Sequence, residues 1–327
     1  MRTAVTGGSG VVGTAVVRHL IEGGHEVRAL ARSEGSAANL SALGAEPVPG
    51  DILDGSTVRD LVAGCDWVFH VAGVNELCSR APEEMWRVNV EGTRIALEAC
   101  ASSGVQRMIH TSSAVTLGEA SDEPATESSS HRGHFLSEYE RSKWEAERVA
   151  LGTAHDIDVV SVNPSSVQGP GRAGGTGALL LAAARGRLSL AVDATFSLVD
   201  IDDCARGHLL AAERGLPGQR YVLSGETLTT RRLIALLGDV TGRRSSPWYV
   251  RHSALEAVAP VVETVFKLLG MQAPLCAESA RVLLSGHRYD GSRATRDLGL
   301  AYTPIEETLS RTVEWFRDEG LLRPAHA

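Results

Sequence analysis

The sequence predicts an α/β fold: a doubly wound parallel sheet with a smaller C-terminal lobe. Short β-rich runs alternate with longer helical patterns over roughly the first half of the chain, and such alternation places a parallel sheet between two layers of helices. A glycine-rich turn joins the first β-rich run to the first helical pattern. After the stretch GPGR (169–172) the pattern becomes irregular, which indicates a second, smaller unit.

The expected elements follow in order along the chain. Strands are predicted at TAVT (3–6), HEVRALAR (25–32), AEPVPGD (45–51), DWVFHVAG (66–73), VQRMIHTSS (105–113), DIDVVSVNPS (156–165) and GQRYVLSG (218–225). Helical patterns lie between them, in GVVGTAVVRHLIEGG, STVRDLVAGC, EEMWRVNVEGTRIALEACASSG and the segment that contains YERSK. The strand near 218–225 is expected to return to the sheet formed by the first half.

Composition excludes several classes of function. The chain has 327 residues and a formal net charge of −8, so it lacks the basic surplus that a nucleic-acid or acidic-membrane partner requires. Its five cysteines lie far apart without a C-x-x-C pair; we therefore expect neither a disulfide framework nor a metal site. Strand-like residues begin almost at Met1, so no signal peptide is expected. The cysteine pattern and this expectation together favour a cytoplasmic location.

The most apolar late stretch is ALEAVAPVVETVFKLLGM (254–271). It contains Glu256, Pro260, Glu263 and Lys267, so it is a poor membrane span. We expect a helix that covers a core or a pocket, with attachment to a membrane surface as the alternative.

A long polar loop is predicted over 118–138. Loops of this length inside a compact domain are commonly functional or mobile, so we expect a lid over a ligand. His131 and His134 lie in this loop and either contact the ligand or remain solvated.

The turn VTGGSGVVG (5–13) fits both G-x-G-x-x-G and T-G-x-x-G-x-x-G. It lies directly after a predicted strand and opens a helix, where backbone N–H groups and the helix dipole bind a pyrophosphate. The turn therefore predicts a Rossmann-type dinucleotide site. Its expected contacts are Gly7, Ser9, Gly10, Val11, Val12 and Gly13.

The end of the second strand indicates which dinucleotide binds. An acidic residue there would bind a ribose 2′-hydroxyl, but this chain has Arg32 and no acid before Glu34. A guanidinium is a planar, multidentate partner for a 2′-phosphate. We therefore expect NADP(H) in preference to NAD(H), with Arg28 as a second candidate contact.

Further cofactor contacts are predicted where later strands end. Asp51 suits the adenine amino group and Ile52 the adenine ring, unless Asp51 only caps the next helix. Small residues at Val71, Ala72 and Gly73 allow the backbone to pass close to a cofactor. The fifth strand ends in three hydroxyl residues, Thr111, Ser112 and Ser113, at the edge of the sheet where ligands bind in such folds. Of these three, Thr111 is the expected cofactor contact.

Tyr139 and Lys143 in YERSK are four residues apart, and helical spacing places them on one face. Together with the turn and the hydroxyl cluster, this order resembles the extended short-chain dehydrogenase/reductases, also called the NAD-dependent epimerase/dehydratase family. The resemblance covers essentially the whole chain. Within the family, the chain is most similar to dihydroflavonol-reductase-like proteins and hopanoid-associated sugar epimerases. The other segments that carry the resemblance are NVEGT (89–93), NPSSVQGPG (163–171) and VDIDDCARGHLLA (199–211).

The resemblance implies roles for individual residues. Tyr139 corresponds to the general acid/base, and Lys143 to the lysine that favours the phenolate and binds the nicotinamide ribose. Ser113 corresponds to the serine that binds the substrate oxygen, and Asn89 to a structural or proton-relay asparagine. Residues Pro164, Ser165, Ser166 and Val167 correspond to the segment beside the nicotinamide. Residues 1–165 would then form the NADP-binding domain and 166–327 mainly the substrate-binding lobe, interleaved with it.

Two departures bear on the substrate. Gly118 stands where plant dihydroflavonol reductases have a flavonoid-binding asparagine, and TLG (116–118) replaces the VYG of familiar sugar-nucleotide epimerases. Neither a flavonoid nor a UDP-sugar is therefore the expected substrate.

The predicted function is an NADP(H)-dependent oxidoreductase that reduces a carbonyl or oxidises a secondary alcohol. The alternative is an epimerase or dehydratase that acts on a sugar-like substrate with the cofactor held tightly. A non-catalytic nucleotide sensor is a third interpretation, which the complete Ser–Tyr–Lys set disfavours. The expected partner is a small molecule, with a homodimer as the assembly to test.

Overall fold

The computed structural model describes residues 1–119, 123–152, 157–271, 273 and 275–322. Its main layer is a seven-stranded sheet of order β10-β6-β5-β4-β1-β2-β3, and every pairing in it is parallel. The strands are β1 (Arg2–Thr6), β2 (Glu26–Ala31), β3 (Glu46–Pro49), β4 (Trp67–His70), β5 (Arg107–Thr111), β6 (Asp158–Pro164) and β10 (Arg220–Leu223). The order reverses between β1 and β4, and ligands of such sheets bind outside the carboxyl ends of the strands at this point.

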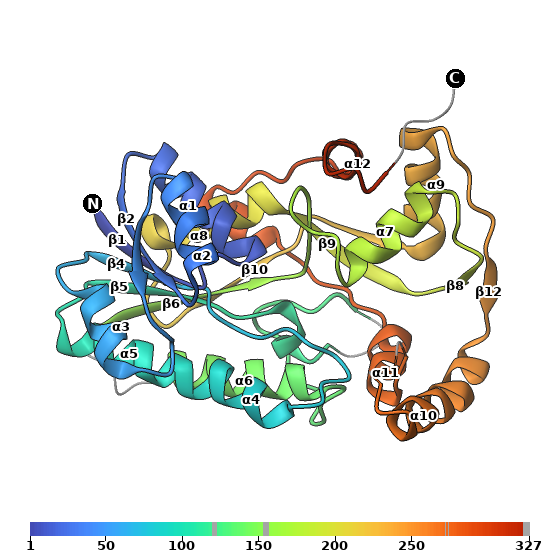
Figure 1. Cartoon of the computed structure of the whole chain (residues 1–327), viewed down its shortest axis with the longest axis horizontal. Helices are drawn as coiled ribbons and strands as arrows, with labels where there is room; N and C mark the ends of the chain where they lie inside the picture. Colours follow the sequence, from blue (N-terminus) through green and yellow to red (C-terminus); the bar gives the residue numbers. More distant parts are fainter. Residues whose placement is uncertain (120–122, 153–156, 272, 274, 323–327) are drawn as a thin grey trace.

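Helices cover both faces of the sheet (Figure 1). On one face lie α1 (Val11–Glu22), α2 (Glu34–Ala42) and α8 (Ile201–Arg214); they bury Leu20, Leu40 and Cys204 in one core. On the other lie α3 (Gly55–Val62), α5 (Gly92–Ser102) and α6 (Glu138–Ala150); they bury Leu61, Leu97 and Ala150 in a second core. These two layers confirm the predicted doubly wound α/β fold.

Capping residues fix where the helices that carry the site begin. The side chain of Ser137 accepts a hydrogen bond from the backbone N–H of Glu140 at 3.0 Å and so starts α6. Asp54 caps α3, and Asp200 caps α8. Such caps satisfy N–H groups that have no partner within the helix. Before α5, the chain forms helix α4 (Pro82–Trp86) and a π-helical turn, Arg87–Glu91.

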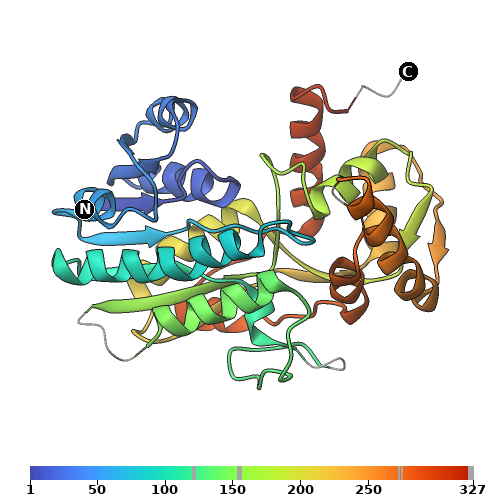
Figure 2. The same cartoon turned by 60° about the horizontal axis from the view of Figure 1, so that its bottom comes forward.

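The smaller part of the molecule contains two short sheets and five helices among the described residues. One sheet has the order β11-β9-β7 and the other pairs β12 with β8. The strands are β7 (Ser166–Gln168), β8 (Leu190–Val192), β9 (Thr195–Asp200), β11 (Glu226–Thr229) and β12 (Trp248–Val250). The helices are α7 (Thr176–Ala184), α9 (Thr230–Thr241), α10 (His252–Leu268), α11 (Ala277–Ser285) and α12 (Ile305–Asp318). Figure 2 shows this part beside the main sheet.

Helix α10 packs against α11. Its Leu255 and Ala259 pack with Ala280 of α11 in a small core. Val261, Val265 and Leu268 are exposed on its outer side. Among the described residues, no helix combines the length and apolarity needed to cross a membrane.

A disulfide corrects the expectation drawn from the cysteines. Cys78, in the loop after β4, is bonded to Cys276 at the start of α11, 198 residues away in sequence. Cys65, Cys100 and Cys204 are free and buried. Sequence spacing gave no sign of the bond because only the folded chain brings these two segments together. The cysteine-based argument for a reducing cytoplasm therefore no longer holds.

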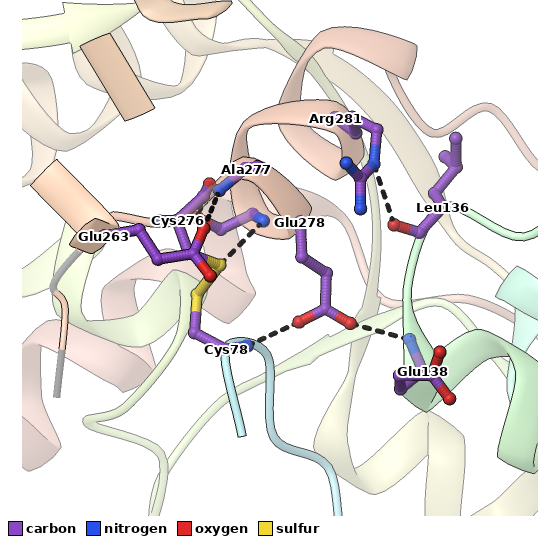
Figure 3. Close-up of a disulfide and its surroundings, with 9 residues drawn as sticks. Cys78, Leu136, Glu138, Glu263, Cys276, Ala277, Glu278 and Arg281 are labelled. Carbon is purple, nitrogen blue, oxygen red and sulfur yellow. Dashed lines mark hydrogen bonds between the residues drawn. A yellow bond between two sulfur atoms is a disulfide. The ribbon is translucent and has the colours of Figure 1, made fainter. Parts of the chain in front are cut away.

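Glu278, on α11, reinforces the same junction (Figure 3). Its carboxylate accepts hydrogen bonds from the backbone N–H of Cys78 and of Glu138, each at 2.6 Å. The loop after β4, the start of α6 and the start of α11 are thus joined at one place by one covalent bond and two charge-assisted hydrogen bonds.

Candidate active site

A cavity of about 940 Å³ opens at the carboxyl edge of the main sheet and extends to β9 and α11. Apart from Arg28, every residue expected to contact the cofactor lines it, as do Ser113 and Tyr139. The cofactor candidates in the lining are Gly7, Ser9, Gly10, Val11, Val12, Gly13, Arg32, Asp51, Ile52, Val71, Ala72, Gly73, Thr111, Tyr139, Lys143, Pro164, Ser165, Ser166 and Val167. Asn89 and Arg28 lie outside the lining.

The glycine turn packs too tightly for side chains. Gly7 has φ +71°, and a Cβ there would lie 2.6 Å from the backbone nitrogen of Ala72. A Cβ on Gly13 would lie 2.0 Å from the Gly7 oxygen. The turn thus brings the start of α1 against the end of β4 and leaves a bare backbone surface, which a pyrophosphate requires.

Arg32 and Arg28 differ in their contacts with the rest of the protein. Arg32 follows β2, is exposed, and has no ion pair or hydrogen bond in the described part of the chain. Arg28 pairs with Glu46 at 3.3 Å and donates to the carbonyls of Asp60 and Leu61. The guanidinium of Arg28 is therefore committed to the fold, and Arg32 remains as the candidate for a 2′-phosphate.

Asp51 and Ile52 lie where an adenine would be expected. The Asp51 carboxylate accepts a hydrogen bond from the backbone N–H of Leu53 at 2.9 Å, which fixes the turn before α3. Ile52 is buried and contacts Gly92, where a Cβ would lie only 3.1 Å from its side chain.

Lys143 is buried beneath the cavity floor. Its ammonium donates to the carbonyl oxygen of Thr111 at 2.8 Å. Burial lowers the pKa of Lys143 to about 8, against the opposing effect of the Glu147 charge. A Cβ on Gly73 would lie 3.7 Å from the ammonium nitrogen, so the loop after β4 passes directly over it.

Tyr139 differs from the sequence expectation in its electrostatics. Burial raises the pKa of its phenol, while the hydrogen bond from Ser113 and the charge of Arg172 act in the opposite direction. The sequence argument assigned the lowering effect to Lys143, but its ammonium is directed to Thr111. Arg172, which lines the cavity beside Tyr139, is the nearby cation that acts on the phenol.

Asn89 connects two parts of the site without entering the cavity. Its side-chain oxygen accepts from the backbone N–H of Val74 at 2.7 Å, and its amide donates to the Val74 carbonyl and to Ser142. These bonds use its polar atoms to fasten the loop after β4 to α6, next to Lys143. The geometry favours the structural interpretation of Asn89 over a proton relay.

The described part of the polar loop is fastened at several points. Arg132 donates its backbone N–H to the Gly118 carbonyl. The backbone N–H of Ala125 donates to the Arg288 carbonyl, and the Ala125 carbonyl accepts from the N–H of Asp290. Glu127 accepts from the backbone N–H of Val222 at 2.8 Å. We therefore treat these described residues as a fixed segment and not as a lid, and within it Ser137 lines the cavity; residues 120–122 lie outside the described residues.

Neither loop histidine is in the cavity lining. His131 packs against Phe135 and Trp144, and His134 is exposed. The ring of His131 fills the space beside Gly118, where a Cβ would lie 2.2 Å from it. An asparagine at position 118, as in the plant reductases, would collide with this ring.

Sequence reasoning missed the cavity wall contributed by the C-terminal part. Val282 and Leu283 of α11, and His287 and Tyr289 after it, line the cavity together with Phe196 of β9. No recognisable motif marks these residues, and their neighbours across the cavity are distant in sequence.

Known proteins share this architecture along the whole chain. A dihydroflavonol 4-reductase, so named provisionally, from Synechocystis sp. is 34% identical and covers 98% of this chain and 95% of its own. The 4-hydroxy-2-methyl-3-oxo-4-farnesyl-3,4-dihydroquinoline-1-oxide ketoreductase of Stigmatella aurantiaca is 33% identical, covering 92% of each. The crystal structure of gox2253 superimposes with a TM-score of 0.86 at 32% identity, covering 98% of this chain and 99% of its own.

A family model agrees with these relatives. Residues 3–224 match the model of the NAD dependent epimerase/dehydratase family, which is the part of the chain that contains the glycine turn, Ser113, Tyr139 and Lys143. The chain therefore belongs to the NAD-dependent epimerase/dehydratase family, within the extended short-chain dehydrogenase/reductases, a class of NAD(P)-dependent enzymes.

Proposed function

We propose that the protein is an NADP(H)-dependent oxidoreductase that interconverts a ketone and a secondary alcohol. The observation that carries the proposal is the convergence of Ser113, Tyr139 and Lys143 on the cavity floor beside the glycine turn. Both similar curated proteins described above have reductase names. We further propose that residues 1–165 serve mainly the cofactor and 166–327 mainly the substrate.

The residues present fit a nicotinamide dinucleotide. The bare glycine turn suits a pyrophosphate, and the exposed, unpaired guanidinium of Arg32 suits a 2′-phosphate. The bound cofactor would supply the hydride that reaches the carbonyl carbon.

The chain's own residues would manage the proton and the orientation of substrate. In the reducing direction, Tyr139 gives its phenolic proton to the substrate oxygen, which becomes a hydroxyl. The Ser113 hydroxyl donates a hydrogen bond to the same oxygen and positions it. Arg172 is the cationic group beside Tyr139 that stabilises the resulting phenolate, while Lys143 holds the end of β5 through the Thr111 carbonyl.

Tyr139→Phe tests this function because it removes only the hydroxyl. We expect turnover of an accepted ketone to fall by at least about a hundredfold, the scale of a positioned proton donor, with cofactor affinity unchanged. Tyr249→Phe, on β12 and outside the cavity lining, is the matched control. A fully active Tyr139→Phe enzyme would refute the mechanism.

Epimerisation or dehydration is the second candidate, which the matched family model favours. These reactions return the hydride to the substrate, so they consume no net cofactor. Stoichiometric oxidation of NADPH by a ketone supports the reductase, whereas product formation at constant NADPH supports the alternative.

A further inference from the structure

The cavity wall opposite the main sheet carries a histidine that the proposed reaction does not use. His287 follows α11 and lines the cavity. Its Nδ1 lies 2.6 Å from a carboxylate oxygen of Glu119, and the Tyr289 hydroxyl lies 3.0 Å from the same oxygen. Glu119 is only 4% exposed and Tyr289 only 6%, so this polar cluster is built into the wall.

The protons in this cluster can be assigned from its acceptors. Burial alone would raise the pKa of Glu119, but the hydrogen bond from His287 and the charge of Arg132 help to lower it below the ordinary value. Burial, followed by the charge of Glu119, raises the pKa of Tyr289, which stays a phenol. An ionised carboxylate only accepts, so both Nδ1 of His287 and the Tyr289 hydroxyl donate to Glu119.

Nε2 of His287 is left for the cavity. No hydrogen bond to this atom is found among the described residues. Since it is also not one of the fully buried polar atoms without a partner, it is open to the cavity. With the ring proton on Nδ1, the neutral tautomer of a histidine carries its lone pair on Nε2. The wall therefore presents a hydrogen-bond acceptor.

The backbone holds the histidine in place. The His287 N–H donates to the Thr195 carbonyl at 3.0 Å, and the Ser197 hydroxyl donates to the His287 carbonyl at 2.9 Å. Ser197 also accepts from the Tyr289 N–H at 3.0 Å. Because β9 fixes the segment on both sides of the ring, the acceptor is positioned before any ligand arrives.

The charges behind His287 favour a neutral donor as its ligand. Arg132 contacts both Glu119 and Glu140, so one guanidinium faces two buried carboxyl groups, while burial lowers the pKa of the neighbouring His131. A ligand carboxylate at His287 would add negative charge to this cluster. A hydroxyl would add none and would donate to Nε2.

We infer that His287 is a substrate-recognition residue that accepts a hydrogen bond from a hydroxyl group of a hydroxylated ketone. The inference rests on the proposed function, since the carbonyl is held by Ser113 and Tyr139 in the same cavity. Phe196, Val282 and Leu283 supply apolar wall around it, so the substrate is an apolar body with a second oxygen placed away from the reacting carbonyl.

Matched ketones test the inference. Deoxybenzoin has no hydroxyl, benzoin has one beside the carbonyl, and 4′-hydroxydeoxybenzoin has one at the far ring. Affinities are measured for the NADP-loaded protein by ligand-observed NMR. We expect 4′-hydroxydeoxybenzoin to bind at least about tenfold more tightly than deoxybenzoin, the scale of one hydrogen bond, and benzoin to gain less. Equal affinities for all three would overturn the inference.

Two variants assign the preference to this residue. His287→Phe keeps a ring of similar size and removes both nitrogens, so it should abolish the preference while NADP affinity stays unchanged. Glu119→Gln keeps the volume but replaces the carboxylate by an amide, whose NH2 group can donate to Nδ1 and move the ring proton to Nε2, so it should weaken the preference without abolishing it. A preference that survives in both variants would overturn the inference.

Two further results separate the explanations. Tighter binding of 4′-carboxydeoxybenzoin than of either hydroxylated ketone would show that His287 acts as a cation, and would overturn the assignment as an acceptor. A His287-dependent hydroxyl preference without NADPH oxidation by any ketone would refute the proposed reductase function and leave the recognition residue supported.

Discussion

The ammonium of Lys143 donates to the carbonyl oxygen of Thr111 at 2.8 Å, and so joins α6 to the end of β5 beneath the cavity. A buried ammonium is costly, since burial lowers the pKa of Lys143 from 10.5 to about 8. In the unfolded chain the same group keeps its ordinary pKa. The site therefore contains a charge that opposes folding at neutral pH.

Lys143→Met should stabilise the fold while it abolishes activity. At neutral pH the wild type is protonated in both states and carries the full penalty. Between about pH 8 and 10.5 the unfolded chain binds more protons than the folded one, so wild-type stability rises with pH. We expect Lys143→Met to be more stable at neutral pH by on the order of 2 kcal/mol, after the cost of the unpaired Thr111 carbonyl.

Urea unfolding at neutral pH and at about pH 10 measures this difference. The advantage of Lys143→Met should shrink at the higher pH. An advantage that is constant or grows with pH would contradict the assigned direction of the Lys143 pKa.

Arg32→Ala should weaken NADPH binding by about ten- to a hundredfold and leave NADH binding nearly unchanged, because only the 2′-phosphate loses a charge-assisted partner. Calorimetric titration with both cofactors gives the answer. Arg94→Ala is the control, since Arg94 is half-exposed, pairs with Glu91 on the surface and lies outside the cavity lining. Equal losses for NADPH and NADH would remove Arg32 from the 2′-phosphate site.

Gly118→Asn should destabilise the protein by about 2 kcal/mol or more, because the new Cβ would lie 2.2 Å from the His131 ring. An asparagine tolerates the φ of +59° found there, so the collision is the main cost. In the background of His131→Ala the same change should cost much less. Thermal unfolding of the wild type, the two single variants and the double variant completes a double-mutant cycle. Additive effects on stability would show that the two sites are independent.

Cys78→Ser should lower the free energy of unfolding by about 2–5 kcal/mol, the usual range for losing a disulfide. A dithiol reductant should have the same effect on the wild type and none on the Cys78→Ser/Cys276→Ser double variant. Thiol titration of the denatured, unreduced wild type should find three free cysteines, Cys65, Cys100 and Cys204. A count of five would show that the bond is absent in solution.

The sequence predicted those parts of the site whose residues are close along the chain. The glycine turn lies between one strand and the next helix, and Tyr139 and Lys143 occupy one helical face, so local periodicity was sufficient. The carboxyl edges of β1, β4 and β5 meet in any parallel sheet, which brought Gly7, Gly73 and Thr111 into one prediction.

Pairs that depend on the tertiary fold could not be read from the sequence. Glu119 and His287 are 168 residues apart, and nothing local in either segment indicates the other. The pKa of Tyr139 was predicted in the wrong direction because burial, which a sequence pattern does not reveal, outweighs the nearby charges. The sequence left Asn89 as either a structural or a proton-relay residue, and only its partners Val74 and Ser142 favour the structural role.

The bond between Cys78 and Cys276 also decides what a protease can separate. Any single cut between these two residues leaves the fragments covalently joined, so a nicked molecule would run as one band on a non-reducing gel and as two bands after reduction. Glu278 holds the same junction through the backbone of Cys78 and Glu138 (Figure 3). Limited proteolysis could thus map accessible sites in the polar loop while the cavity walls remain attached to each other.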